Sequence, residues 1–80
     1  MAVKAKSATW EERASRYLKA ELKRADVTYD ELAVRLAKHG FKVVTKASIA
    51  NKLARGTFAA IFLVACLAAL ELDGVQLEDI

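Results

Sequence analysis

Hydrogen-bonding side chains are concentrated in the segment TKASIANKLAR, residues 45–55. They are Thr45, Lys46, Ser48, Asn51, Lys52 and Arg55. If Ile49 and Leu53 face the protein interior, these side chains fall on the outer face or the flanks of a helix. Asparagine can pair with adenine through two hydrogen bonds, and lysine and arginine can contact guanine or phosphate. The segment therefore suits nucleic-acid recognition, although a short surface helix is also polar for solvation alone.

The positive charge of the chain lies in the same part of the sequence. All 13 Lys and Arg residues occur in residues 1–55, together with six of the ten acids. Residues 57–80 carry the other four acids and neither Lys nor Arg. This polarised distribution favours a polyanionic partner for the basic part, and the alternative is an ordinary solvated surface.

No catalytic or metal-binding pattern is present in the sequence. His39 is the only histidine and has no second histidine or cysteine at ligand spacing. Cys66 lies in an apolar stretch, where a thiol behaves as a small hydrophobic group. Neither a glycine-rich phosphate loop nor a Ser-His-Asp arrangement occurs. We therefore expect no enzymatic activity, no metal, no cofactor and no small-molecule substrate.

Length and composition indicate a single small domain. Eighty residues with 55% apolar content suffice for one core. The single cysteine excludes an intramolecular disulfide and is typical of a reduced, cytoplasmic protein. The longest apolar run, residues 58–70, is shorter than the roughly 20 residues that span a bilayer, so no membrane association is expected. The composition divides the chain into a basic N-terminal arm (1–8), a helical domain (9–72) and an acidic tail (73–80).

The first two of four predicted helices begin at capping signals. Thr9 with Glu12, and Thr28 with Glu31, have the spacing of a capping box, and apolar residues follow each at helical spacing. Gly40 is suited to the left-handed conformation that ends a helix, so the second helix is expected to end near residues 38–39.

A connector and two further helices complete the prediction. Residues 41–44 are partly β-branched and indicate an extended connector. Thr45 is expected to cap a third helix that Gly56 ends, and Thr57 to cap a fourth helix from Phe58 to about Leu70. Because the fourth helix is apolar on all sides, we expect it to be central, with the other three packed around it.

The segments LKRADVTYDELAVRLAKHG and TKASIANKLARGTF resemble the λ-repressor-like (Cro/C1-type) helix-turn-helix domain. The matching residues are Thr28, Glu31, Leu32, Ala33, Ile49, Arg55, Gly56 and the apolar helix from Phe58. The chain also resembles a small bacterial family of unknown function. The first resemblance implies a compact all-α domain of four or five helices, with double-stranded DNA as the partner and transcription regulation as the function. The interval between Leu36 and Ile49 is longer than in that family and adds an extended connector between helices two and three.

Two residues outside the third helix are further candidates for contact with a DNA backbone, the first of them through the resemblance. Tyr29 takes the position of the first residue of helix two, which often lies against a phosphate, and the alternative is an aromatic side chain on the core. Lys42, in the connector, is suited to a phosphate or to solvation alone. One alternative to DNA binding is a protein–protein interaction module of the same fold without DNA readout, and another is non-specific RNA or nucleoid binding through charge alone.

Self-association is the second predicted interaction. The λ-repressor-like fold commonly has a fifth helix, whereas about ten residues follow the fourth helix here. An apolar face that lacks an internal partner usually marks an interface, and a twofold dimer is its commonest form. The candidate residues are Phe58, Phe62, Leu63, Leu67 and Leu70. The alternative is that the tail, through Val75, Leu77 and Ile80, folds back over that face.

Overall fold

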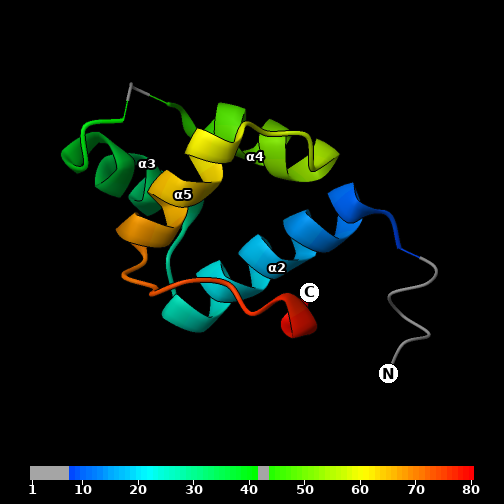
Figure 1. Ribbon diagram of the computed structural model, residues 1–80. Coiled ribbons are helices and arrows are strands. Elements are labelled where there is room, and N and C mark those ends of the chain that lie inside the picture. Colours follow the sequence, from blue (N-terminus) through cyan, green and yellow to red (C-terminus); the bar gives the residue numbers. More distant parts are fainter. Residues whose placement is uncertain (1–7, 42–43) are drawn as a thin grey trace.

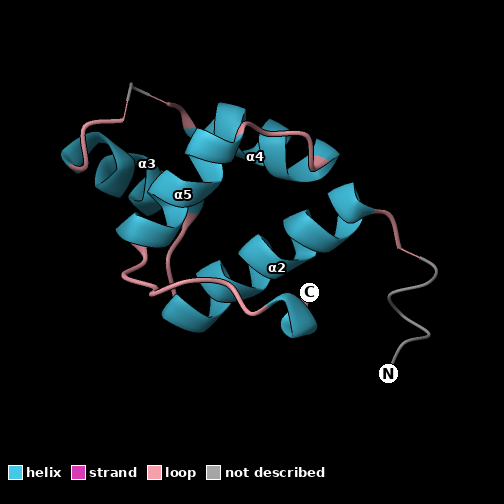
Figure 2. Cartoon of the chain, viewed as in Figure 1, coloured by secondary structure: helices cyan, strands magenta, loops and turns pink. Residues whose placement is uncertain are grey.

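Four α-helices and one short 3₁₀-helix form the computed structural model, which describes residues 8–41 and 44–80 (Figure 1). The elements are α2 (Trp10–Ala25), α3 (Tyr29–Lys38), α4 (Lys46–Arg55), α5 (Ala60–Ala69) and η1 (Leu77–Asp79). The described residues contain no strand, as Figure 2 shows. The predicted all-α class is therefore confirmed.

Threonine caps begin α2, α3 and α4 where the sequence predicts them. Thr9 accepts a hydrogen bond from the amide of Glu12 at 3.1 Å, and Glu12 accepts one from the amide of Thr9 at 3.1 Å. This is a complete capping box. Thr28 accepts from the amide of Glu31 at 3.1 Å, and Thr45 caps α4 in the same way. Satisfying these otherwise unpaired amides fixes three of the four helix starts.

The start predicted for the fourth helix is wrong. Thr57 does not cap α5, which begins two residues later than predicted with Ala59 as an N-cap that makes no side-chain hydrogen bond. Phe58 instead packs against Phe62, with ring centroids 5.4 Å apart. This apolar contact joins the residue before the N-cap to the first turn of α5, one position earlier than in a hydrophobic staple.

Glycines end two of the helical segments as predicted. Gly40 follows the C-cap residue His39 and has φ +83°, and Gly56 is the C-cap of α4 with φ +70°. A Cβ atom at Gly56 would collide with the main-chain carbonyl of Glu11 in α2. Gly56 is therefore required both for its backbone conformation and for the close approach of α2 to the end of α4.

The hydrophobic core lies among all four α-helices, each of which contributes buried side chains. α2 packs on α4, α3 packs on both α4 and α5, and Figure 1 shows the resulting arrangement. The largest fully buried side chains are Leu18, Leu32, Leu36, Ile49, Leu53, Phe62 and Cys66. Every helix thus contributes an apolar stripe, as expected for a small domain.

The expectation that the fourth helix is surrounded by the others is wrong. α5 buries Phe62, Cys66 and Ala69, whereas Ile61 and Val64 are 70% and 62% exposed. The physical reason is that α5 packs mainly against α3, so only one side of it is covered. Its uniformly apolar sequence carries no polar stripe that would indicate which side faces solvent.

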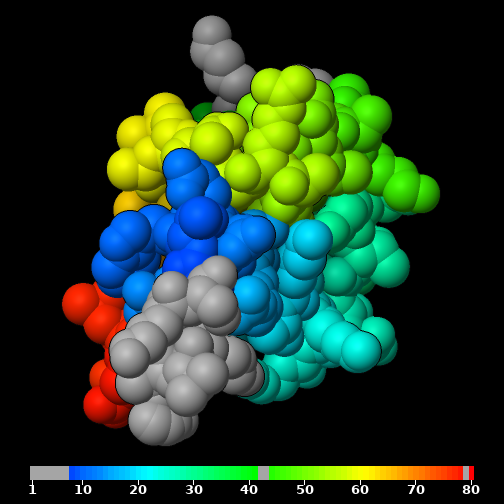
Figure 3. Space-filling view, turned by 90° about the vertical axis from the view of Figure 1, so that its right-hand side faces the viewer, coloured from blue at the N-terminus to red at the C-terminus, as the bar shows by residue number. Residues whose placement is uncertain are grey.

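The C-terminal tail folds back along α2 (Figures 1 and 3). Glu71, with φ +60°, reverses the chain after α5, and the amide of Leu72 donates to the carbonyl of Leu67 at 2.9 Å. Arg13 of α2 donates to the main-chain oxygen of Ile80 at 3.1 Å. The tail therefore returns along α2 and leaves Ile61 and Val64 of α5 exposed, so the expectation that it folds back over the apolar face of the fourth helix is wrong.

No single helix among the described residues has the length and apolar composition to cross a membrane. α4 and α5 meet these criteria only when taken together, and they are bent by 118° relative to each other.

Candidate nucleic-acid interface

The helix that carries the candidate recognition residues is held firmly from one side. Ile49 and Leu53 of α4 are fully buried against the core. The hydroxyl of Ser15 in α2 donates a buried hydrogen bond to the carbonyl of Leu53, which belongs to the otherwise unpaired last turn of α4. Figure 3 shows part of α4 at the molecular surface, above α2.

The outermost stripe of α4 consists of three residues. Ala47, Asn51 and Ala54 are all exposed, and their spacing of i, i+4 and i+7 places them on one face of the helix. Asn51 is the polar member of the stripe and lies between the two alanines. Arg55 is also exposed and lies beside this stripe in the last turn. The predicted outward position of Asn51 and Arg55 agrees with the structure.

The two lysines of α4 lie on its flanks. The ammonium of Lys46 is 3.9 Å from the carboxylate of Asp30 in α3, and the two side chains are 66% and 74% exposed. Such an exposed pair contributes little to stability, and Lys46 remains available to solvent. Lys52 is half-buried, with its ammonium 5.7 Å from the ring centroid of Phe62. Each lysine is thus directed toward a neighbouring helix.

The N-terminus of α4 differs in charge from that of α3. The first turn of α4 contains no acidic residue, whereas Asp30 and Glu31 occupy the first turn of α3. Thr45 caps α4 by accepting from the amide of Ser48 at 3.0 Å, and Ser48 itself is half-buried. Because a helix N-terminus favours anions, the start of α4 suits a phosphate better than the start of α3 does.

The two phosphate contacts predicted outside α4 both stay predictions. Tyr29, the first residue of α3, is half-buried and packs against the hydrophobic core, which agrees with the alternative interpretation of this residue. Lys42 lies outside the described residues, and its contact stays a prediction.

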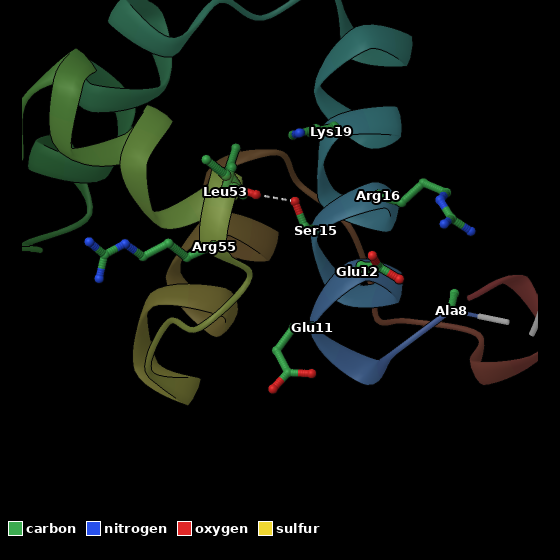
Figure 4. Close-up of a pocket in the computed structure, with 9 residues that line it drawn as sticks. Ala8, Glu11, Glu12, Ser15, Arg16, Lys19, Leu53 and Arg55 are labelled. Carbon is green, nitrogen blue, oxygen red and sulfur yellow. Dashed lines mark hydrogen bonds between the residues drawn. The ribbon is translucent and has the colours of Figure 1, made fainter.

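A cleft of about 500 Å³ lies between α2 and the C-terminal end of α4 (Figure 4). Lys19 points from α2 toward α4, whereas Arg16 and Arg55 extend away from each other on opposite sides. Glu11 and Glu12 line the same cleft at the first turn of α2. The cleft thus carries charges of both signs and does not form a uniformly basic surface.

Sequence reasoning about hydrogen-bonding chemistry did not single out Lys19, Ala47 or Ala54. The alanines carry no polar atom in their side chains, so their only signal is their spacing around Asn51. Lys19 belongs to a different helix, and its position beside α4 depends on the packing of α2.

The residues proposed for self-association do not share one exposed face. Phe62 and Leu70 are 1% and 8% exposed, so they belong to the core and are removed from the candidate surface. Phe58, Leu63 and Leu67 are half-buried. α5 packs on α3 with its buried side. Its exposed apolar face therefore consists of Ile61 and Val64, together with Ala60 and Ala68.

A family model described as a domain of unknown function (DUF6471) matches residues 10–75, which include all four α-helices. No curated protein and no solved structure matches the chain.

Proposed function

The chain belongs to the family described as a domain of unknown function (DUF6471), and we propose that it is a non-enzymatic, cytoplasmic DNA-binding protein that regulates transcription. In this proposal α3 and α4 act as a helix-turn-helix of the λ-repressor-like kind, with α4 as the recognition helix. The observation that carries the proposal is the exposed face of α4, which presents Asn51 and Arg55 in a segment, residues 44–70, that contains no acidic residue.

The dimensions and charges of α4 are compatible with a DNA groove. Its ten residues correspond to a length of about 15 Å, and an α-helix fits the major groove, which is about 12 Å wide. Asn51 would then face the base edges. Arg55 at one end, with Lys46 and the free amides at the other, would contact phosphates on either side of the groove.

The proposal is tested by mapping the contact surface with amide chemical shifts. We expect a double-stranded oligonucleotide at low salt to shift the resonances of residues 45–56 more than those of α5. The charge-neutral variant Arg55→Gln should weaken binding. Lys38→Gln serves as a matched control, because it removes the same charge at the far end of α3. Lys38 lies eight residues, or about 12 Å along the helix, from Asp30, which contacts Lys46 of α4. Shifts confined to α5, or equal effects of the two variants, would contradict the assignment.

A second candidate function is a protein–protein interaction module. The observation that favours it is the exposed pair Ile61 and Val64 on α5, because adjacent exposed apolar side chains commonly mark an interface. A second copy of the chain is the simplest partner, and a twofold dimer would bury the same patch on both subunits. This face lies on α5 rather than on the stripe of Asn51, so self-association and DNA binding are compatible.

A further inference from the structure

Asn51 occupies the centre of the exposed face of α4, between the small side chains of Ala47 and Ala54, and the exposed Arg55 lies one turn further along. Ala47 precedes it by one helical turn and Ala54 follows it by slightly less than one turn, and all three residues are exposed. An alanine extends only one carbon from the backbone. Neither alanine would therefore keep the Asn51 amide from reaching a base edge in a groove.

The other polar residues of α4 are less well placed for base contacts. Lys46 is drawn toward Asp30 of α3, and Lys52 lies over the ring of Phe62. Ser48 is half-buried, and Arg55 lies in the last turn of the helix. These positions suit contacts with phosphates, which fix the orientation of a protein on DNA without reading its sequence.

We propose that α4 selects an A·T base pair, with Asn51 as the residue that recognises adenine and Ala47 and Ala54 in contact with thymine methyl groups. This inference rests on the proposed function. An asparagine amide offers one donor and one acceptor, which match the N7 acceptor and N6 donor of adenine. Guanine presents two acceptors at the same edge, so only half of the amide would be satisfied. Alanine side chains favour the apolar C5-methyl group of thymine.

The experiment selects binding sites from a duplex library with a randomised centre, using the full chain. We expect the selected sites to share an adenine at one position, with thymine beside it. In Asn51→Ala the preference for that adenine should fall by roughly fivefold or more, since one bidentate contact provides about 1–3 kcal/mol of discrimination. Its affinity for unselected duplex should change little, because Asn51 carries no charge.

Two controls test whether the preference comes from the Asn51 amide and from the thymine methyl group. Gln76→Ala removes the other exposed amide side chain of the chain, in the tail, and should leave the preference intact. Replacing the selected thymine by uracil removes only the methyl group and should weaken binding of the wild type by about fourfold, as expected for one buried methyl-sized group.

The outcomes distinguish this inference from the proposed function. If the wild type binds duplex but selects no A·T pair, or if Asn51→Ala keeps the same preference, the inference is wrong and DNA binding stands. If the wild type binds no duplex at low salt, the proposed function and the inference both fail.

Discussion

The hydroxyl of Ser15 in α2 donates a buried hydrogen bond to the main-chain carbonyl of Leu53 in α4. This bond joins the first helix to the last turn of the candidate recognition helix, and both residues are buried. Ser15→Ala leaves that carbonyl without its donor, so we expect the free energy of unfolding to fall by about 1–2 kcal/mol. Ser48→Ala, at a half-buried serine, should cost less than about 0.5 kcal/mol. Urea unfolding of the two variants checks the difference, and equal losses would contradict it.

Gly56 and Gly40 provide a matched pair of glycines with positive φ. A methyl group at Gly56 would collide with the carbonyl of Glu11, whereas at Gly40 it would meet no described atom within 4 Å. Gly40→Ala should therefore lower the free energy of unfolding only by the strain of an alanine in the left-handed conformation, about 1–2 kcal/mol. Gly56→Ala must in addition push α2 away from α4, so we expect its free energy of unfolding to fall by at least twice as much. Thermal unfolding of both variants measures this order, and a smaller effect at Gly56 would refute the close packing.

Cys66 makes stability depend on pH in the alkaline range. Burial raises the pKa of its thiol from 9.0 to about 12, because the thiolate is poorly solvated in the core. The unfolded chain loses this proton from about pH 9 upward and the folded chain does not. Stability should consequently fall as the pH rises from 9 toward 12.

The effect of the thiol is isolated by comparing the wild type with Cys66→Ala. Between pH 8 and pH 10 the wild type should lose about 1 kcal/mol more stability than the variant does. The comparison of slopes removes the constant cost of the smaller alanine side chain and the titration shared by both proteins. Parallel pH profiles in urea unfolding would show that the thiol ionises as easily in the folded chain.

Self-association is expected to depend on the exposed face of α5. Replacing Ile61 or Val64 by glutamate would put a charge into a dimer interface and should shift the equilibrium toward monomer by at least tenfold. Because both side chains are more than 60% exposed, the fold should be retained. Leu77→Glu, at an equally exposed apolar residue in η1, is the matched control. Sedimentation equilibrium that finds only monomer for the wild type at tens of micromolar would contradict the prediction.

Helix positions could be predicted largely because local signals determine them. Thr9, Thr28 and Thr45 are polar caps that precede apolar stripes, and each begins a helix in the structure. The same reasoning is wrong at Thr57, since α5 begins two residues later and Phe58 packs against Phe62 one turn further along the chain. A cap contributes only about 1 kcal/mol, so an aromatic contact in the core can override it.

The candidate site could be predicted in part. The outward position of Asn51 follows from the inward spacing of Ile49 and Leu53, which is a property of one helix. The pairing of Lys46 with Asp30 and the position of Lys52 over Phe62 depend on neighbouring helices and have no signal within α4. The sequence likewise did not indicate which residues of α5 are buried, since an evenly apolar helix has no preferred face.

The central claim is that α4 binds double-stranded DNA, and its most direct test is a duplex titration at several salt concentrations. We expect the logarithm of affinity to fall linearly with the logarithm of salt concentration, with a slope of roughly −0.9 for each phosphate neutralised. Arg55→Gln should weaken binding and flatten that slope by about one, whereas Lys38→Gln should match the wild type. A folded protein without duplex affinity at low salt, even near 10⁻⁴ M where non-specific binding is still detectable, would contradict the claim.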